Sequence, residues 1–473
     1  MASNAHQRHQ RHQRSLIEPS PMLKAELKHL AFEYPISPVA HRSPQILSLV
    51  FSGDAAVLKN LANKFDFPSH IAGTNRSAAN ELQPFAAEYS PVDLGIDYLD
   101  DEAPAKIQHA LANATLFGGP AANQVSVSDG LLRLRRAIST LYSRLIGREL
   151  DAQENVVITA GATEAVNSAF SGHTSPGDEW VVIEPAYTMY LPMIKMARGV
   201  PRFTSLKLRK HRGRIDGEDW VLDKAEMESL FSEKTKGILL NNPLNPIGKV
   251  YTREELEFIG SLAVKYNTIV VCDEAHEWVT HKPHIRIASL PGMFERTITV
   301  GSSSKSFSVS GWRIGWAYGP KEILNHVKTV HANTLDSAPT PQQQAVASAF
   351  EDEIRDFGSP DSYFVSHRRH VQWQRNFLTK AFADVGMRPV VSDGGYCMLV
   401  DWTPLRRRFG GKVNGAMDFV KWMIRNVGVL GLPMSSYYGD AHKHMGENFA
   451  RYCFHKKNDT LIEAARRLKK LNK

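Results

Sequence analysis

Short apolar runs rich in β-branched residues alternate with amphipathic segments between about residues 105 and 330. The amphipathic segments, such as 128–145 and 252–265, repeat their apolar residues with the period of a helix. Near-continuous apolar strands between helices are typical of a sheet covered on both faces, which predicts an α/β fold with mostly parallel pairing. The predicted strands are 155–159, 180–183, 237–240, 268–272, 297–300 and 314–318.

The pattern differs at the two ends of the chain. After about residue 335, a long helical region precedes a short alternation of strands and helices, which predicts a second, smaller α+β domain. These elements are helical region 341–385, strand 395–400, helix 415–426, strand 448–454 and helix 459–471. Repeated prolines interrupt short helical pieces before residue 90, so we expect no separate core there. We therefore predict an N-terminal tail and wrapping segment (1–90), a large domain (91–335) and a small C-terminal domain (336–473).

The composition is that of an ordinary globular protein, with 42% hydrophobic and 22% charged residues among 473. It excludes a mostly disordered, collagen-like or coiled-coil chain. No apolar run approaches the roughly 18 residues of a membrane helix, so we predict no membrane segment. The formal charge of +8 is small for this length, and the basic bias lies at the chain ends. We therefore predict no nucleic-acid partner.

The three cysteines, Cys272, Cys397 and Cys453, lie far apart and form no Cys-x-x-Cys pair. This spacing predicts neither a metal site nor a disulfide framework, and it fits a reducing compartment, so we predict a cytoplasmic protein. The tripeptide His-Gln-Arg occurs three times in residues 6–14. That segment is typical of a disordered tail, and an organelle transit peptide is the alternative.

Chemically active residues follow directly after the predicted strands, where ligands bind in mostly parallel sheets. The turn 160–165 is rich in small residues and opens a helix, so its backbone N–H groups are available to an anion. Tyr187 follows the second strand and can stack on a flat ligand. Asn245, in the rigid turn Asn-Asn-Pro-Leu-Asn-Pro-Ile-Gly, follows the third strand, and Asp273 follows the fourth.

A lysine and an arginine complete this set. Lys305 lies on a small-residue loop after the fifth strand, and Arg313 follows eight positions later. An imine-forming amine beside a bidentate anion clamp suits a cofactor with an aldehyde and a phosphate. With an amide for a phenolate oxygen and a carboxylate for a protonatable ring nitrogen, the set matches pyridoxal 5′-phosphate (PLP).

In this order and spacing, the motifs resemble those of fold-type I PLP enzymes of the class I and II aminotransferases, over roughly residues 90–473. Three segments are most similar to the kynurenine aminotransferase / cysteine-S-conjugate β-lyase branch: Ile-Ala-Ser-Leu-Pro-Gly-Met (287–293), Gly-Trp-Arg-Ile-Gly-Trp (311–316) and Phe-Val-Lys-Trp-Met-Ile (419–424). Residues 159–165 have a fainter likeness to 1-aminocyclopropane-1-carboxylate synthases. The resemblance implies a homodimer with active sites at the subunit interface.

The resemblance also implies roles on the cofactor side. Lys305 would bind the cofactor covalently and then move the proton on the substrate Cα, while Asp273 would keep the ring nitrogen protonated. Asn245 would hydrogen-bond the phenolate, and Tyr187 would stack on the ring. The residues placed around the phosphate are Ala162, Thr163, Ser302, Ser304 and Arg313.

On the substrate side, the resemblance places Arg451 at the α-carboxylate and Gly95 where the N-terminal segment passes over the substrate. Here the chain departs from the family pattern. The tyrosine expected three positions after the aspartate is His276, as in the Asp-Glu-Ile-His element of bacterial C–S lyases. His276 is either a catalytic residue or a replacement for the hydrogen bond of that tyrosine. The family's Asn-Gln-Tyr reads Asn-Gln-Val at 123–125, so the hydroxyl that reaches the partner's phosphate is missing.

The aromatic residues that line the pocket of the kynurenine branch are missing as well. Their positions hold Ala79, Asp336, Ser337 and Cys397. A large aromatic substrate would lose most of its contact area in such a pocket. We therefore expect a polar or cationic amino acid, with the carboxylate of Asp336 available to its side chain. The alternative is that Asp336 is a solvent-facing loop residue.

The motifs and the departures from the family pattern leave four possible functions. Transamination between a polar or cationic L-amino acid and a 2-oxo acid is our main prediction. The alternatives on the same cofactor are β- or γ-elimination or replacement, on C–S or S-adenosylmethionine-type substrates, and oxidation of a basic amino acid. A non-catalytic binding protein is disfavoured by the intact Lys305, Asp273, Asn245 and Arg451.

Overall fold

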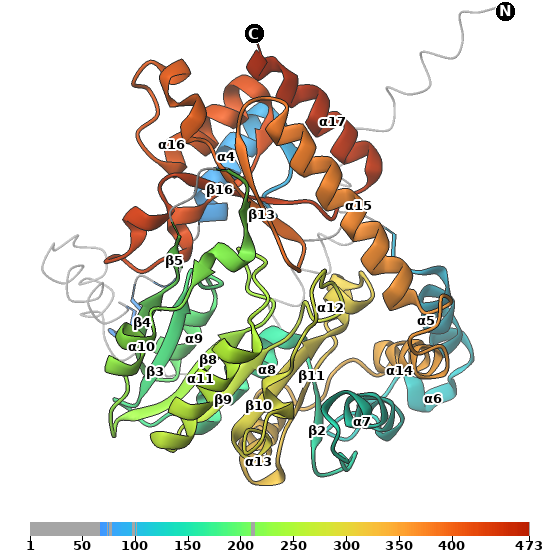
Figure 1. Cartoon of the computed structure of the whole chain (residues 1–473). Helices are drawn as coiled ribbons and strands as arrows, with labels where there is room; N and C mark the ends of the chain where they lie inside the picture. Colours follow the sequence, from blue (N-terminus) through green and yellow to red (C-terminus); the bar gives the residue numbers. More distant parts are fainter. Residues whose placement is uncertain are drawn as a thin grey trace, which may run out of the picture. The chain divides into compact units, whose positions relative to one another are not determined.

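A seven-stranded sheet forms the middle of the chain, with the strand order β2-β11-β10-β9-β8-β3-β4 in the computed structural model (Figure 1). Neighbouring strands are parallel, except that β11 runs antiparallel to both β10 and β2. The strands are β2 (Val156–Thr159), β3 (Glu179–Glu184), β4 (Val200–Ser205), β8 (Thr235–Asn241), β9 (Ile269–Asp273), β10 (Thr297–Ser302) and β11 (Gly315–Tyr318). The structure describes residues 67–72, 74, 78–96, 100, 102–209 and 213–472, and those from Ser69 onward belong to one compact unit. The His-Gln-Arg repeats lie outside the described residues.

The six predicted strands are confirmed, and β4 is an additional strand that the sequence pattern did not predict. β4 is at the edge of the sheet, where it pairs only with β3. Its first residues are partly or well exposed, so the run Val-Pro-Arg-Phe-Thr-Ser is not continuously apolar. A proline is tolerated on an edge strand because no neighbour needs its missing N–H.

Helices cover both faces of this sheet. On one face, the buried residues of α8 (Ala162–His173), α9 (Tyr190–Met196) and α13 (Lys321–Thr334) pack together with strand residues such as Val182. On the other face, α11 (Arg253–Lys265) packs in a cluster that contains the neighbouring Val181 and Ile183. Because successive side chains of a strand point to opposite faces, this alternation confirms a sheet buried on both sides.

Local sequence explains where these helices begin and end. Thr252 caps α11 by accepting a hydrogen bond from the N–H of Glu255, whose side chain accepts the N–H of Thr252 in return. The helix α7 (Leu132–Ile146) ends at Gly147, which has the positive φ of 68° that commonly stops a helix. α7 packs beside α14 (Thr340–Arg355) at the β2 end of the sheet.

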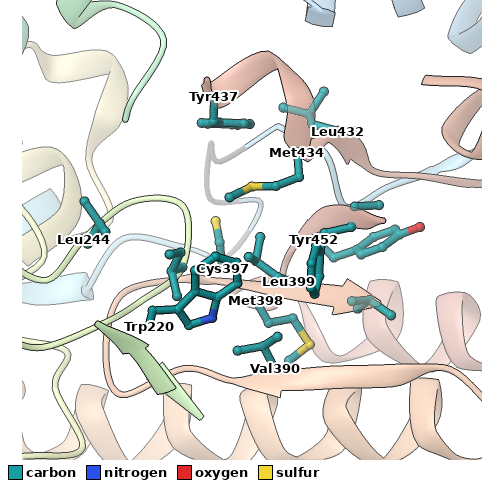
Figure 2. Packing of buried hydrophobic residues seen from close by; sticks show 14 of the residues in the cluster. Trp220, Leu244, Val390, Cys397, Met398, Leu399, Leu432, Met434, Tyr437 and Tyr452 are labelled. Carbon is teal, nitrogen blue, oxygen red and sulfur yellow. The ribbon is translucent and has the colours of Figure 1, made fainter. Parts of the chain in front are cut away.

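A second sheet of five strands has the order β15-β16-β13-β12-β6. Its strands are β6 (Ile215–Asp216), β12 (Arg388–Val391), β13 (Cys397–Asp401), β15 (Leu432–Pro433) and β16 (Phe449–Cys453). It packs with α15 (Tyr363–Ala383), α16 (Ala416–Trp422) and α17 (Asn458–Leu468). Its core is continuous with one face of the first sheet, because Trp220, Cys397 and Met398, labelled in Figure 2, belong to the same buried cluster as Val181 and Ile183.

The helical region predicted over 341–385 is confirmed, and it consists of two helices, α14 and α15. The break contains Gly358, Ser359 and Pro360, and Ser362 caps the start of α15. The strand β12 was not predicted, and its second residue is Pro389.

Near the N-terminus, α4 (Ala78–Tyr89) buries Leu82, and its Glu81 forms an ion pair with Lys421. Among the described residues, no helix is long and apolar enough to cross a membrane.

Candidate functional site

A cavity of about 230 Å³ opens at the carboxyl ends of β8, β9 and β10, beside the first turn of α8. All ten residues that the sequence assigned to catalysis or cofactor binding line it: Ala162, Thr163, Tyr187, Asn245, Asp273, His276, Ser302, Ser304, Lys305 and Arg313. These residues come from segments as far apart in the chain as α8 and the loop after β10. The rule that ligands bind beyond the ends of parallel strands therefore located the cavity correctly.

One end of the cavity is built to receive an anion. The helix α8 begins after Gly161, with no side chain capping its first N–H groups. The Arg313 guanidinium donates to the carbonyls of Ala160 and Ser310, and these bonds hold it against Gly161. The hydroxyl of Ser304 is buried and has no protein partner among the described residues. Free N–H groups, a guanidinium and a spare hydroxyl are the donors that a phosphate requires.

Gly161 is required at this end by its backbone and by its surroundings. Its φ is 85°, and a Cβ built there would lie 2.4 Å from Nη2 of Arg313. A Cβ on Gly315 would lie 2.4 Å from the backbone carbon of Gly161, so β11 can pass this close only without a side chain. The anion-binding turn is thus set by two glycines and one arginine.

Asp273 ends β9 inside the cavity and is 8% exposed. Its carboxylate accepts the Tyr190 hydroxyl at 2.7 Å and the Ala275 N–H at 3.0 Å. Burial raises the pKa of Asp273, while these two hydrogen bonds and the charge of Lys305 oppose the rise. A buried carboxylate of this kind is stabilised by a cationic partner, and a protonated ring nitrogen can supply one.

The turn after β8 holds Asn245 in the cavity through its neighbours. The side chain of Asn241 donates to the carbonyl of Asp273 and accepts the N–H of Asn245 at 2.7 Å. Asn242 accepts the N–H of Tyr251 and donates to the carbonyl of Ile285. These bonds tie the turn both to β9 and to the following segment, so its conformation is fixed before a ligand binds.

Lys305 lies on the short helix α12 (Ser303–Ser306), directly after β10. Its backbone carbonyl accepts the hydroxyl of Tyr396 at 2.5 Å, and its Nζ is 5.9 Å from the centre of the Tyr396 ring. His276 packs edge-on against the same ring at 5.3 Å. Tyr396 therefore contacts Lys305 and His276, two of the three residues that the sequence named as catalytic, although it was not predicted itself.

Arg451 and Gly95 lie outside the lining of this cavity but contact each other. Arg451 is on β16 and is 1% exposed. Its guanidinium donates to the carbonyl of Gly95 at 3.4 Å, to the sulfur of Cys397 at 2.9 Å and to the hydroxyl of Tyr437. Tyr437 also accepts the N–H of Ala186, next to Tyr187, through its backbone carbonyl. Arg451 is thus connected to the loop that carries the predicted stacking residue.

Three positions at which the sequence departs from the family pattern, Asp336, Val125 and Ala79, do not line the cavity in this chain. Asp336 follows α13, is exposed and has a φ of 70°. Val125 is 74% exposed. Ala79 is partly buried on α4 against the core of the second sheet. The structure therefore does not bring Asp336 together with Lys305 within one chain.

Sequence reasoning missed Tyr190, Asn241 and Tyr396. The signal for Tyr190 was its position, three residues after Tyr187 at the start of a helix. Asn241 begins the same Asn-Asn-Pro turn that carries Asn245, and the motif alone predicted a role only for Asn245. Tyr396 had no local signal, because its contact with Lys305 joins residues 91 positions apart.

A group of buried acidic residues lies behind Asp273. Glu274, Glu277 and His284 bring possible ligand atoms within 4.8 Å of one another. Arg286 forms ion pairs with both carboxylates, and Tyr142 donates to Glu277. Because Arg286 already forms ion pairs with both carboxylates, we assign no metal to the group.

Comparisons with known proteins agree with the geometry. The family model for aminotransferase class I and II matches residues 91–468. Mouse kynurenine–oxoglutarate transaminase 3 is 36% identical over 430 residues, which cover 90% of this chain and 93% of that protein. Two solved structures are similar. Bna3p from Saccharomyces cerevisiae, described as a candidate kynurenine aminotransferase, has a TM-score of 0.79 at 29% identity and covers 85% of this chain and 97% of that chain. N-succinyldiaminopimelate aminotransferase from Mycobacterium tuberculosis has a TM-score of 0.77 at 31% identity and covers 86% of this chain and 100% of that chain.

Proposed function

The chain belongs to the class I and II aminotransferases, and on this premise we propose that the cavity around Lys305 holds PLP and serves transamination of a polar or cationic L-amino acid. The predicted family, fold-type I architecture and enzyme class are confirmed by this membership. PLP is the cofactor of the family, and a 2-oxo acid is its amino-group acceptor. The observation that carries the proposal is that Lys305, Asp273 and Arg313 line one cavity.

The donors in the cavity fit this cofactor. The first turn of α8, the Arg313 guanidinium and the buried Ser304 hydroxyl would hold its phosphate. The Asp273 carboxylate would accept a hydrogen bond from the protonated ring nitrogen, and the Asn245 amide would face the phenolate oxygen. When bound, PLP draws electrons from the substrate Cα and so makes the proton on that carbon acidic. Tyr187, which packs against Tyr190 at 5.5 Å, would cover the ring.

Two residues would then perform the proton transfer and the orientation. The amine of Lys305 would take the proton from the substrate Cα and return it to the carbon on the other side of the amino nitrogen. Arg451 binds the α-carboxylate of the amino acid, because a fixed guanidinium can form two parallel hydrogen bonds with it. Holding the carboxylate fixes the direction of the Cα–H bond relative to Lys305. Tyr437 and Cys397 keep the guanidinium in place.

The substrate class is proposed from the residues around Arg451. Cys397, a small side chain with 4% exposure, occupies the space beside the guanidinium. Ala79 leaves a similarly small side chain on α4. Without ring contacts at these positions, an aromatic donor gains little from binding. We therefore propose a donor with a polar or cationic side chain, and kynurenine, named for the mouse relative, is the competing donor.

We also propose a cytoplasmic homodimer. Four large apolar side chains are exposed close together in sequence, with exposures of 71% for Leu116, 80% for Phe117, 74% for Val125 and 64% for Val127. A second copy of the chain would cover such residues. The three cysteines are free, which fits a reducing compartment. Light scattering on the purified protein measures the mass of the assembly.

The half-reaction with single amino acids tests the proposed function. Purified holoenzyme is mixed with L-arginine, L-glutamine, L-kynurenine, L-cystathionine or S-adenosylmethionine, without any 2-oxo acid. We expect the visible absorption of the cofactor to disappear once per site, fastest with a polar or cationic donor, and to return when a 2-oxo acid is added. Fastest loss with L-kynurenine contradicts the substrate class. Continuous release of ammonia or uptake of oxygen contradicts transamination and supports elimination, for which His276 in the cavity is the motivating residue, or oxidation.

A further inference from the structure

Tyr396 connects the second sheet to the lysine of the cavity. It precedes β13, is 1% exposed, and donates its hydroxyl to the backbone carbonyl of Lys305 at 2.5 Å. The same hydroxyl is 3.0 Å from Nε2 of His367 on α15. Nδ1 of His367 is in turn 3.2 Å from the hydroxyl of Tyr363, at the start of α15. Three side chains thus form one continuous line of hydrogen bonds that ends at Lys305.

The direction of every bond in this line follows from chemistry. A carbonyl only accepts, so the single hydroxyl proton of Tyr396 belongs to the bond with Lys305. His367 must then donate from Nε2, which leaves Nδ1 of a neutral ring as an acceptor. Tyr363 therefore donates to Nδ1. The carbonyl of Lys305 therefore determines which atom donates in each hydrogen bond from Tyr396 through His367 to Tyr363.

The two histidines that contact Tyr396 from α15 and from the segment after β16, His367 and His455, are neutral near pH 7. Burial lowers the pKa of His367 to about 3, and burial likewise lowers the pKa of His455 well below its ordinary value. His455 stacks on the Tyr396 ring at 4.9 Å and bonds Gln374 through Nδ1 at 2.7 Å. A neutral ring has one N–H donor and one acceptor, which is what the line requires. It also places no positive charge against the amine of Lys305.

We propose that Tyr396 is a positioning residue of the reaction, which, oriented by His367, holds the backbone at Lys305 so that the amine points at the substrate Cα. The inference rests on the proposed function, because it presumes that Lys305 performs the proton transfer. The helix α12 that carries Lys305 has only four residues. So short a helix has few hydrogen bonds of its own, and a contact from outside it fixes the carbonyl in the middle of its single turn.

The variant Tyr396→Phe tests the proposal, because it removes the hydroxyl and keeps the ring between His276 and His455. We expect kcat of the fastest donor in the panel to fall about tenfold or more, as for a misplaced catalytic group. KM for that donor and the cofactor content, measured by absorbance after alkaline release, are expected to stay within about twofold. The matched control is Tyr452→Phe, which deletes a buried hydroxyl of β16 that has no partner among the described residues.

A second pair of variants tests the orientation of the hydroxyl. Phenylalanine in His367→Phe cannot donate to Tyr396, whereas the amide in His367→Gln can donate to Tyr396 and accept from Tyr363. We expect kcat to fall several-fold in His367→Phe and to recover at least in part in His367→Gln. Thermal unfolding of all four variants shows how far stability alone changes. If Tyr396→Phe folds only at low temperature, the comparison of His367→Phe with His367→Gln still tests whether the oriented hydroxyl positions Lys305.

Two results overturn the inference. One is a kcat of Tyr396→Phe equal to that of Tyr452→Phe, and the other is a loss that only follows the cofactor content. Either leaves the proposed function standing, provided that Lys305→Ala is inactive. If Lys305→Ala keeps transaminating, the proposed function fails first. The two failures are therefore distinguishable in one set of assays.

Discussion

The cofactor half of the candidate site is built from loops at the ends of neighbouring strands, whereas the substrate half joins segments from distant parts of the chain. Asp273 and Lys305 end or follow adjacent strands of one sheet, so the sheet itself brings them together. Gly95 and Arg451 are 356 positions apart and meet only because the second sheet packs against the segment after α4. Asp336 is exposed and outside the cavity. The sheet thus brings the cofactor half together directly, whereas the substrate half depends on packing between distant segments.

The largest expected effect is at the centre of the cofactor half. Replacing Lys305 with alanine should lower the rate of the half-reaction about 10⁴-fold or more, because the amine both binds the cofactor and moves the proton. Borohydride reduction followed by mass spectrometry should no longer attach the cofactor to the chain. Lys321→Ala is the control, since Lys321 is an exposed lysine paired with Glu154. Retained turnover in Lys305→Ala would disprove the site.

Asp273→Asn separates function from stability in the same half. We expect activity to fall about 10²- to 10³-fold, because the ring nitrogen loses its charged partner. Burial raises the pKa of Asp273 above its unfolded value, so the folded state retains the proton to higher pH. The cost of burying the charge is therefore absent at pH values below the unfolded pKa and appears as the pH rises through the folded pKa.

For the cofactor-free protein, the Tm of Asp273→Asn at pH 8 should therefore equal or exceed that of the wild type, and the difference should shrink toward pH 4. Circular dichroism melts at both pH values measure this. A clear loss of Tm at pH 8 would mean that the hydrogen bonds from Tyr190 and Ala275 outweigh the buried charge.

In the substrate half, Arg451→Lys should raise KM for the amino acid about tenfold to a hundredfold and change kcat less. A lysine keeps the charge but cannot form the two parallel bonds of a guanidinium. Steady-state kinetics with the fastest donor separate KM from kcat. Arg388→Lys on β12 serves as the control, because Arg388 pairs with Asp401 in the same sheet. If both variants behave alike, Arg451 does not bind the α-carboxylate.

The smallest expected effect is at Asp336. Asp336→Asn should reduce the preference for L-arginine over L-glutamine about fivefold or less, because an exposed charge contributes at most about 1 kcal/mol. Asparagine is chosen because it tolerates the positive φ of 70° at this position. Competition between the two donors in one reaction measures the ratio, with the exposed Asp361→Asn as the control. An unchanged ratio makes Asp336 an ordinary loop residue.

The residues proposed for the cofactor half could be grouped from the sequence because their pattern is local. Each follows a recognisable strand, so Asn245, Asp273 and Lys305 were expected at one edge of the sheet without knowing how the strands pair, and they line one cavity. The prediction did not extend to Tyr190, whose partner Asp273 is 83 positions away. The contact between Tyr396 and Lys305 likewise depends on how the two sheets pack together. The spacing of apolar residues along the sequence carries no information about that packing.

The same reasoning explains the errors in the fold. The strands β4 and β12 each contain a proline, which broke the apolar pattern by which the other strands were recognised. The helical region predicted over 341–385 is confirmed, but the pattern did not locate the break at Pro360 between α14 and α15. A pattern of apolar residues identifies strands and helices buried on a regular face and misses those at edges and breaks.

The crowding around Gly161 has a consequence for how such a protein can change over generations. A side chain at position 161 would force the Arg313 guanidinium away, and one at position 315 would collide with the backbone of Gly161. A side chain at one of these glycines cannot be compensated by a substitution at the other, because each side chain on its own would disrupt the proposed anion-binding turn. A comprehensive mutational library selected for activity should therefore be nearly empty at positions 161 and 315. Positions such as Cys397 and Ala79 lie outside this turn and are free of that particular constraint.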